Sequence, residues 1–309
     1  MNYQHIPVLL SEVLSYLNPK SGENFIDATL GGGGYSRAIS ESVGSGGKIL
    51  AIDLDKDAIE NAKGQMSNVK CLTVAQGNFK DIDKIVKHHK FSPPDGIVAD
   101  LGLSSYELEH RGISFQTNQP LDMRFDQSQE LTAKFILENY DENRLRKIFE
   151  DYGEEKFSRQ IAREVIGYRV KGKEIRQTSD LYQLIVNALP KPVKHRADDS
   201  ARRIFQALRI EVNHELSSLE EFLPKAFGLL APGGKLVVVS FHSLEDRIVK
   251  QFFVKLSKGC VCPLEFPQCI CGKNPKGKIL TKRPVVASEE ELRHNPRSKP
   301  AKLRAIIKL

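Results

Sequence analysis

The chain is 309 residues long, with 40% hydrophobic and 28% charged residues and a formal net charge of +7. This length suffices for one large α/β domain with an insertion, or for two modest domains. No apolar run approaches the roughly 20 residues of a membrane-spanning helix, and the first 19 residues lack the features of a secretory signal. We therefore expect a cytoplasmic globular protein with no membrane partner.

The first third of the chain alternates strand and helix patterns. Apolar residues at helical spacing predict a helix over residues 8–17, which Asn18-Pro19 ends. Short apolar runs separated by helical segments predict four strands, at Phe25–Thr29, Lys48–Leu54, Val69–Val74 and Gly96–Asp100. Such a βαβ series predicts a mainly parallel α/β sheet, with ligands at the carboxyl ends of its strands.

After Asp100 the pattern changes to helical periodicity for about a hundred residues. The α/β pattern resumes with a helix over residues 216–229 and the strand Lys235–Ser240. We therefore predict a discontinuous α/β domain of residues 1–104 and 213–309, interrupted by an inserted helical domain of residues 105–212.

The C-terminal tail contains two strand-like pieces, Arg283–Ala287 and Lys302–Leu309. We expect them to add a terminal hairpin to the edge of the sheet. The Gly/Pro/Lys-rich stretch Gly272–Lys278 is predicted to be a mobile surface loop.

The positive charge is concentrated in two segments. Residues 156–212 hold 13 basic and 6 acidic residues, a net of +7, and residues 273–309 hold 11 basic and 3 acidic ones, a net of +8. Clusters of this kind attract phosphate whatever the nucleotide sequence. A solvated surface explains either cluster alone equally well, but two clusters around one candidate site favour a nucleic-acid partner.

Four consecutive glycines, Gly31–Gly34, follow the first predicted strand and precede a helix. Backbone N–H groups and the helix N-terminus face a ligand at such a turn. Asp53 lies 22 residues after Gly31 at the end of the second strand, the spacing of a carboxylate that binds a ribose diol. A dinucleotide and S-adenosylmethionine both fit. The structural alternative is a tight turn, with Asp53 capping the next helix.

Two features favour S-adenosylmethionine. Ser36 stands where a dinucleotide fingerprint has its third glycine, and its bulk there hinders close packing of helix on strand. Asp27 and Asp100, near the carboxyl edge of the sheet, suit a cationic sulfonium better than a pyrophosphate. A nicotinamide-dependent dehydrogenase is the weaker alternative, also because no His/Arg pair for hydride transfer is evident.

Seven motifs resemble, in order along the chain, those of the bacterial family of small-subunit (16S) ribosomal RNA cytosine N4-methyltransferases. They are Gly31–Arg37 (GGGGYSR), Ala51–Asp55 (AIDLD), Asp100–Ser105 (DLGLSS), Pro120–Asp126 (PLDMRFD), Tyr152–Phe157 (YGEEKF), Phe205–Asn213 (FQALRIEVN) and Ser240–Lys250 (SFHSLEDRIVK). The resemblance implies a class I S-adenosylmethionine-dependent methyltransferase, Rossmann-like, with an inserted helical domain that recognises the substrate. It also implies a decoding-centre cytosine as acceptor, within ribosomal RNA of the assembled small subunit.

The resemblance also assigns site residues. The family's cofactor contacts fall on Gly33, Gly34, Tyr35, Asp53, Phe79, Asp100 and Glu107. Asp53 would hold the ribose hydroxyls and Phe79 would pack against adenine, whereas Glu107 departs from the Gln that the family pattern has there. Asp100 is the main catalytic candidate and Ser104 a weaker one, for which a turn or cap hydroxyl is an equal alternative.

Two further questions stay open at this stage. The loop after Asp100 lacks the Pro-Pro-aromatic sequence of many amine methyltransferases, so the way the amine is held is not fixed. Arg202, Arg203 and Arg209 are candidate RNA contacts, or else pair with acids inside the fold. A non-catalytic ribosome-assembly factor with this fold is the alternative function, which the intact glycines and Asp53 disfavour.

Five cysteines, an odd number, favour reduced thiols over a disulfide framework. Cys260, Cys262, Cys269 and Cys271 form a C-x-C-x6-C-x-C pattern. Zinc sites more often use C-x2-C, so we favour an unligated thiol loop and keep zinc as the lesser alternative. Cys71, among apolar neighbours on the third strand, is expected in the core.

Overall fold

The computed structural model describes residues 7–103, 108, 110–260, 262, 266, 268 and 271–309. The chain divides into two compact units, which we call the sheet unit (Met1–Gly102 and Leu216–Leu309) and the helical unit (Leu103–Glu215). No helix in the described ranges is long and apolar enough to cross a bilayer. Ser104, Glu107 and Cys269 lie outside the described residues.

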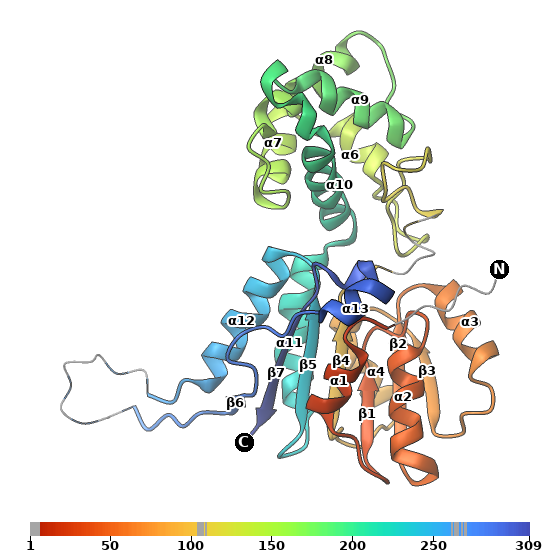
Figure 1. Cartoon of the computed structure of the whole chain (residues 1–309), viewed down its shortest axis with the longest axis vertical. Helices are drawn as coiled ribbons and strands as arrows, with labels where there is room; N and C mark the ends of the chain where they lie inside the picture. The colour runs from red at the N-terminus through yellow and green to blue at the C-terminus, as the bar shows by residue number, and fades with distance from the viewer. Residues whose placement is uncertain are drawn as a thin grey trace. The chain divides into compact units, whose positions relative to one another are not determined.

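The sheet unit is built on a seven-stranded sheet of order β3-β2-β1-β4-β5-β7-β6 (Figure 1). Its strands are β1 (Asn24–Asp27), β2 (Lys48–Asp53), β3 (Leu72–Gln76), β4 (Gly96–Asp100), β5 (Lys235–Ser240), β6 (Gly277–Ile279) and β7 (Lys302–Lys308). Strands β1 to β5 pair in parallel, whereas β7 runs antiparallel to both β5 and β6. The strand order reverses between β1 and β4, and ligands of such sheets bind outside the carboxyl ends of the strands at that point.

Helices cover both faces of the sheet, because successive strand side chains point to opposite sides. Phe25 of β1 packs with residues of α1 and α2, and its neighbour Ile26 packs with residues of α4, α11 and α12. The helices are α1 (Leu10–Leu17), α2 (Gly34–Val43), α3 (Lys56–Gln65), α4 (Ile82–His88), α11 (Glu215–Leu229), α12 (Ser243–Ser257) and α13 (Glu289–His294), with short 3-10 turns η1 (Gly44–Gly46), η2 (Phe79–Asp81) and η4 (Pro296–Ser298).

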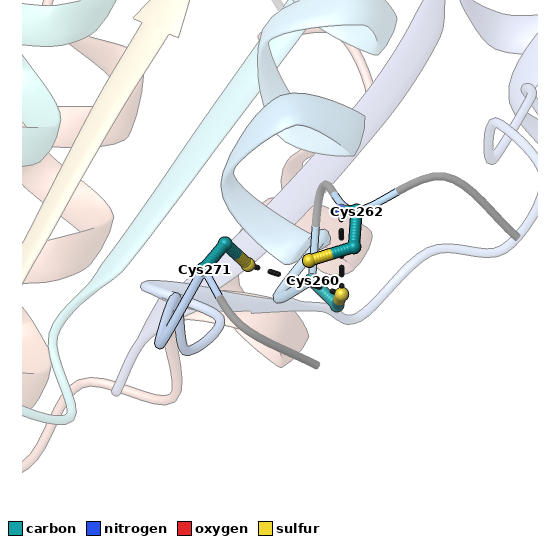
Figure 2. Close-up of side chains that lie close together, drawn as sticks. All are labelled: Cys260, Cys262 and Cys271. Carbon is teal, nitrogen blue, oxygen red and sulfur yellow. Dashed lines mark hydrogen bonds between the residues drawn. The ribbon is translucent and has the colours of Figure 1, made fainter. Parts of the chain in front are cut away.

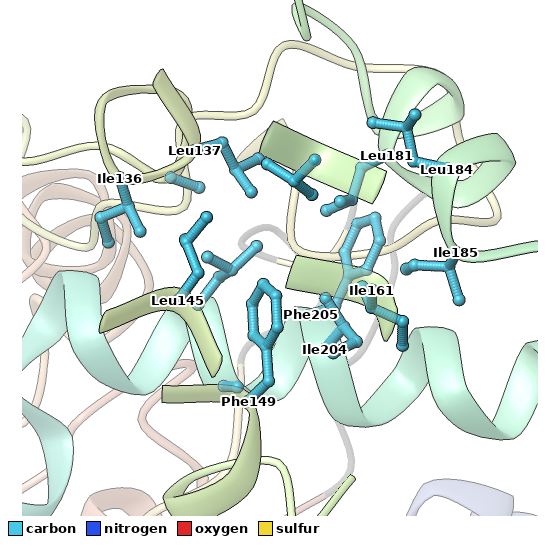
Figure 3. Close-up of a cluster of buried hydrophobic side chains, with 14 of the residues drawn as sticks. Ile136, Leu137, Leu145, Phe149, Ile161, Leu181, Leu184, Ile185, Ile204 and Phe205 are labelled. Atoms are coloured by element: carbon cyan, nitrogen blue, oxygen red, sulfur yellow. The ribbon is translucent and has the colours of Figure 1, made fainter. Parts of the chain in front are cut away.

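The helical unit has a hydrophobic core of its own (Figure 3). Its elements are α6 (Ala133–Asn139), α7 (Glu142–Asp151), α8 (Ser158–Val170), α9 (Thr178–Ala188), η3 (Lys191–Arg196) and α10 (Ala197–Asn213). Phe149 of α7, Ile161 of α8 and Leu181 of α9 are fully buried against α10, whose Ile204 and Phe205 point into the same cluster. A separate core explains why this segment forms a compact unit.

The predicted fourth and fifth strands have the observed bounds, and the third is shifted to Leu72–Gln76. Cys71 therefore lies just before β3, partly buried against the core.

The predicted C-terminal hairpin is wrong in its first strand. Residues 277–279, at the end of the predicted mobile loop, form β6, whereas Arg283–Ala287 contributes only an isolated bridge between Val285 and Leu303. Pro284 lacks the N–H group that a ladder requires, which explains this outcome. Strand β7 is also not terminal: it lies inside the sheet, between β5 and β6.

A buried ion pair joins α12 to β7. The guanidinium of Arg304, whose exposed fraction is 8%, contacts the two carboxylate oxygens of Asp246 at 2.6 and 3.1 Å. Lys302 Nζ lies 3.9 Å from the same carboxylate. Removing one partner of such a pair leaves the other charge buried and uncompensated.

We therefore predict that Asp246→Ala lowers the free energy of unfolding by about 3 kcal/mol. Glu289→Ala is the matched control, because Glu289 is almost fully exposed and lies 4.0 Å from Arg293. Its effect should stay below about 0.5 kcal/mol. Urea denaturation of both variants measures the difference, and equal effects would contradict the importance of the buried pair.

Candidate functional site

The glycine turn lies between β1 and α2, next to the point where the strand order reverses. Gly31 and Gly33 have φ angles of 48° and 75°, in the left-handed region that favours glycine. A Cβ at Gly33 would lie 2.5 Å from Met66 Cε, and one at Gly34 would collide with Pro7. The turn thus needs glycine, and its backbone and the N-terminal N–H groups of α2 supply donors for an anionic group.

Asp53 ends β2 and connects the glycine turn to the segment after β2. Its Oδ2 accepts a hydrogen bond from Gly31 N at 2.7 Å, and its Oδ1 accepts one from Asp55 N at 2.9 Å. Each oxygen retains a lone pair for a ligand hydroxyl. Burial raises the pKa of Asp53, against the lowering effect of the Gly31 N–H. Helix α3 is capped by Asp55 instead, so Asp53 is not its cap.

Asp27, at the end of β1, is fully buried beneath the turn. Its Oδ2 accepts a hydrogen bond from the Ser36 hydroxyl at 2.7 Å, and its Oδ1 accepts one from Thr29 N at 3.3 Å. Burial raises the pKa of Asp27 to about 6, although the Ser36 bond opposes this, and the negative charge of Asp53 adds to the rise. The Ser36 side chain therefore has a definite partner.

Asp100 ends β4, on the other side of β1 from Asp53. Its Oδ1 accepts a bond from Gly102 N at 3.1 Å, and its Oδ2 lies 3.1 Å from the Tyr35 hydroxyl. Burial raises the pKa of Asp100 to about 7, against both hydrogen bonds, and Asp27 raises it further. Thr29 Oγ1 accepts from Asp100 N at 2.7 Å and so fixes the strand end.

Tyr35, in the first turn of α2, is buried and lies between two acceptors. Its hydroxyl contacts the Val8 carbonyl as well as the Asp100 carboxylate. One hydroxyl proton cannot serve both acceptors at once, so Tyr35 compensates the Asp100 carboxylate only in part. Burial, followed by the charge of Asp100, raises the pKa of Tyr35 well above its usual range.

Phe79 lies in η2, just after β3, at the same edge of the sheet as the ends of β1, β2 and β4. The ring is half-buried and meets Phe222 edge-on, with the ring centroids 5.1 Å apart. Asn78 fixes the turn, because its side chain accepts a hydrogen bond from Lys80 N at 3.0 Å. Gly77 N also donates to the Asp53 carbonyl at 2.8 Å, which ties this turn to the end of β2.

The structure thus places most of the predicted cofactor residues at one edge of one sheet. Asp53, Asp27 and Asp100 end the adjacent strands β2, β1 and β4. Their cofactor roles remain proposals, as do those of Ser104 and Glu107, which lie outside the described residues.

Sequence reasoning missed three supporting groups: the Ser36 hydroxyl, the Thr29 hydroxyl and the Val8 carbonyl. Ser36 had been weighed only as a bulky replacement for glycine, yet its hydroxyl bonds Asp27. A small hydroxyl residue nine positions after a buried strand-end aspartate was the available signal. His242, after β5, caps α12 together with Glu245, which agrees with a structural role.

The strand order, with β7 antiparallel between β5 and β6, and the carboxylates around a glycine turn define a class I methyltransferase domain. The dinucleotide-binding order instead ends in a parallel sixth strand beside β5. Residues 2–309 match the MraW methylase family, and the chain belongs to this family.

Curated relatives agree over the full length. The chain is 44% identical over 312 residues to ribosomal RNA small subunit methyltransferase H of Carboxydothermus hydrogenoformans, covering 100% of this chain and 99% of the relative. The protein of that name from Heliobacterium modesticaldum is 42% identical over 313 residues, with 100% of both chains covered. Among solved structures, a putative rRNA-methylase from Clostridium thermocellum has a TM-score of 0.46 and 14% identity, covering 99% of this chain and 100% of its own.

We predict that Asp53→Ala weakens S-adenosylmethionine binding by at least ~100-fold, since each hydrogen bond to a charged group contributes about 1.5–3 kcal/mol. Asp57→Ala, in the exposed first turn of α3, is the control and should bind normally. Calorimetric titration measures the affinities, and circular dichroism checks that both variants are folded. Unchanged affinity in a folded Asp53→Ala variant would exclude Asp53 as the ribose ligand.

Proposed function

We propose that this chain transfers the methyl group of S-adenosylmethionine to the N4 amine of a cytosine in small-subunit ribosomal RNA. Family membership supports methyl transfer, and the names of the relatives support the RNA class. The observation that carries the cofactor assignment is the set of carboxylates at the ends of β1, β2 and β4 around the glycine turn. The N4 position rests on the motif resemblance.

The cofactor fits the donor set. Asp53 offers lone pairs to the ribose hydroxyls, and the half-buried ring of Phe79 offers a surface for adenine. Gly33 and Gly34 let the methionine portion approach the backbone. Tyr35 contributes indirectly, because its hydroxyl hydrogen-bonds the Asp100 carboxylate. Asp27 and Asp100 attract the positive sulfonium and ammonium groups. Glu107 completes the proposed set.

Bound S-adenosylmethionine supplies an electrophilic methyl group. The N4 amine of cytosine is a weak nucleophile because its lone pair is delocalised into the ring. We assign Asp100 the task of accepting a hydrogen bond from this amine, which aligns it and localises the lone pair. When the methyl group is transferred, N4 would lose a proton, and the Asp100 carboxylate is placed to accept it. Ser104 remains the weaker positioning candidate.

The cytosine must be unpaired or turned out of its stack for N4 to be reached. The three arginines considered as RNA contacts all pair with acids: Arg202 with Asp199 at 3.2 Å, Arg203 with Glu155 at 3.3 Å, and Arg209 with Glu215 through two bonds of 2.8 Å. The pairs of Arg203 and Arg209 involve buried or nearly buried carboxylates, which favours a structural role for them.

Other basic residues of the helical unit are better suited to phosphate. Lys156 just before α8, Arg159 in its first turn and Lys171 just after it are exposed. None of them forms an ion pair with a described residue. Their side chains are therefore available to flanking phosphates, which would make RNA binding fall with salt. We propose that this surface holds ribosomal RNA within the assembled small subunit.

Methyl transfer to small subunits from cells that lack the enzyme tests the function. With labelled S-adenosylmethionine and nucleoside analysis, we expect label in N4-methylated cytidine. Asp100→Asn should lower the rate by roughly 100-fold, the usual effect of losing one group that stabilises the transition state, while Asp57→Ala stays active. Naked ribosomal RNA, tested in parallel, should be the poorer acceptor.

Cofactor binding without transfer to any RNA would contradict catalysis and favour the assembly-factor alternative. Label at cytosine C5 would contradict the assigned acceptor atom.

A further inference from the structure

The segment between α12 and β6 is held at its base, and its described residues contribute to no hydrophobic core. Lys276 N donates to the Leu256 carbonyl at 2.9 Å, and Lys258 N donates to the Val254 carbonyl at 3.1 Å. None of its described residues belongs to a hydrophobic cluster of the protein. Ordering such a long loop costs conformational entropy, which apolar burial of its described residues does not offset. An interaction of another kind would help to give it one structure.

Three cysteine sulfurs gather in this segment (Figure 2). The Sγ atoms of Cys260, Cys262 and Cys271 all lie within 4.8 Å of one another, although Cys271 is eleven residues from Cys260. The Cys260 and Cys271 sulfurs are 3.8 Å apart, and Cys262 N donates to the Cys260 sulfur at 3.4 Å. All three residues are present as thiols.

We propose that Cys260, Cys262 and Cys271 bind a structural Zn²⁺ ion. With a zinc–sulfur distance of about 2.3 Å, two sulfurs of a tetrahedral site lie about 3.8 Å apart. The Cys260–Cys271 separation has this value, whereas a disulfide requires about 2.05 Å. The N–H bond from Cys262 to the Cys260 sulfur also stabilises a thiolate, the form that binds metal.

This geometry favours zinc binding, whereas the cysteine spacing alone favoured an unligated thiol loop. The one-residue gap of Cys260-x-Cys262 favours an unligated loop only if these two sulfurs act alone. The fold instead brings in Cys271 from the far side of the loop, so the metal would close the loop and replace a missing core. Cys269 lies outside the described residues and is not part of the proposed set.

The surrounding charge also suits a zinc–thiolate site. Three thiolates and one Zn²⁺ ion carry a net charge of −1. Lys258, Lys273 and Lys276 belong to the same segment and are exposed basic side chains. Their positive charges compensate that negative charge.

The test is the metal content of the full-length protein purified without chelators. We expect about one zinc per chain by elemental mass spectrometry. Cys260→Ser, Cys262→Ser and Cys271→Ser should each lose most of it, whereas Cys71→Ala, which removes a cysteine beside β3, should retain it. Because the segment lies outside the hydrophobic clusters, all the variants should keep the circular dichroism spectrum of the parent.

Cobalt(II) provides a second readout that needs no variant. Replacement of zinc should give the thiolate charge-transfer and visible bands of tetrahedral cobalt. A protein with neither retained zinc nor these bands would overturn the proposal. So would a disulfide between Cys260 and Cys271, found by thiol counting in the protein as purified.

Discussion

Burial of carboxylates at the ends of adjacent parallel strands is the constraint around which the sheet unit is organised. A carboxylate removed from water is unstable as an anion unless hydrogen bonds or a cation compensate it. Asp27 and Asp100 receive only partial compensation, from Ser36 and from Gly102 and Tyr35, so their pKa values rise to about 6 and about 7. A cationic ligand supplies the positive charge that these carboxylates lack, which is why this edge of the sheet suits a sulfonium.

The supporting groups follow from that constraint. Gly31 donates its N–H to Asp53, and α2 begins at Gly34, directly after the glycine turn. In the first turn of α2, Tyr35 contacts Asp100 and Ser36 contacts Asp27. The helical unit shows a different organisation, with its own core and with most of its arginines committed to ion pairs. The proposed chemistry and the proposed RNA contact thus lie mainly on different compact units of the chain.

Sequence periodicity was sufficient for β1, β2, β4 and β5 because these strands are apolar runs, and the strand-end aspartates could be located from them. It placed β3 a few residues too early, because that strand alternates polar and apolar residues. It was insufficient for β6, a three-residue edge strand that pairs with β7 without an apolar pattern of its own. Ser36 was misjudged because a sequence shows bulk but not a hydrogen-bond partner. The Cys260–Cys271 contact depends on closure of the loop at Lys276, which no local spacing reveals.

Proton release on cofactor binding tests the central claim most directly. At about pH 6.5 the Asp27 and Asp100 carboxyls are both partly protonated in the free protein, because their pKa values are raised to about 6 and about 7. A bound cation lowers both pKa values, so S-adenosylmethionine should release close to one proton, measured calorimetrically in buffers of different ionisation enthalpy. S-adenosylhomocysteine, which keeps the ammonium group but lacks the sulfonium charge, should release less, and so should the Asp100→Asn variant. Binding of S-adenosylmethionine without proton release would contradict the account.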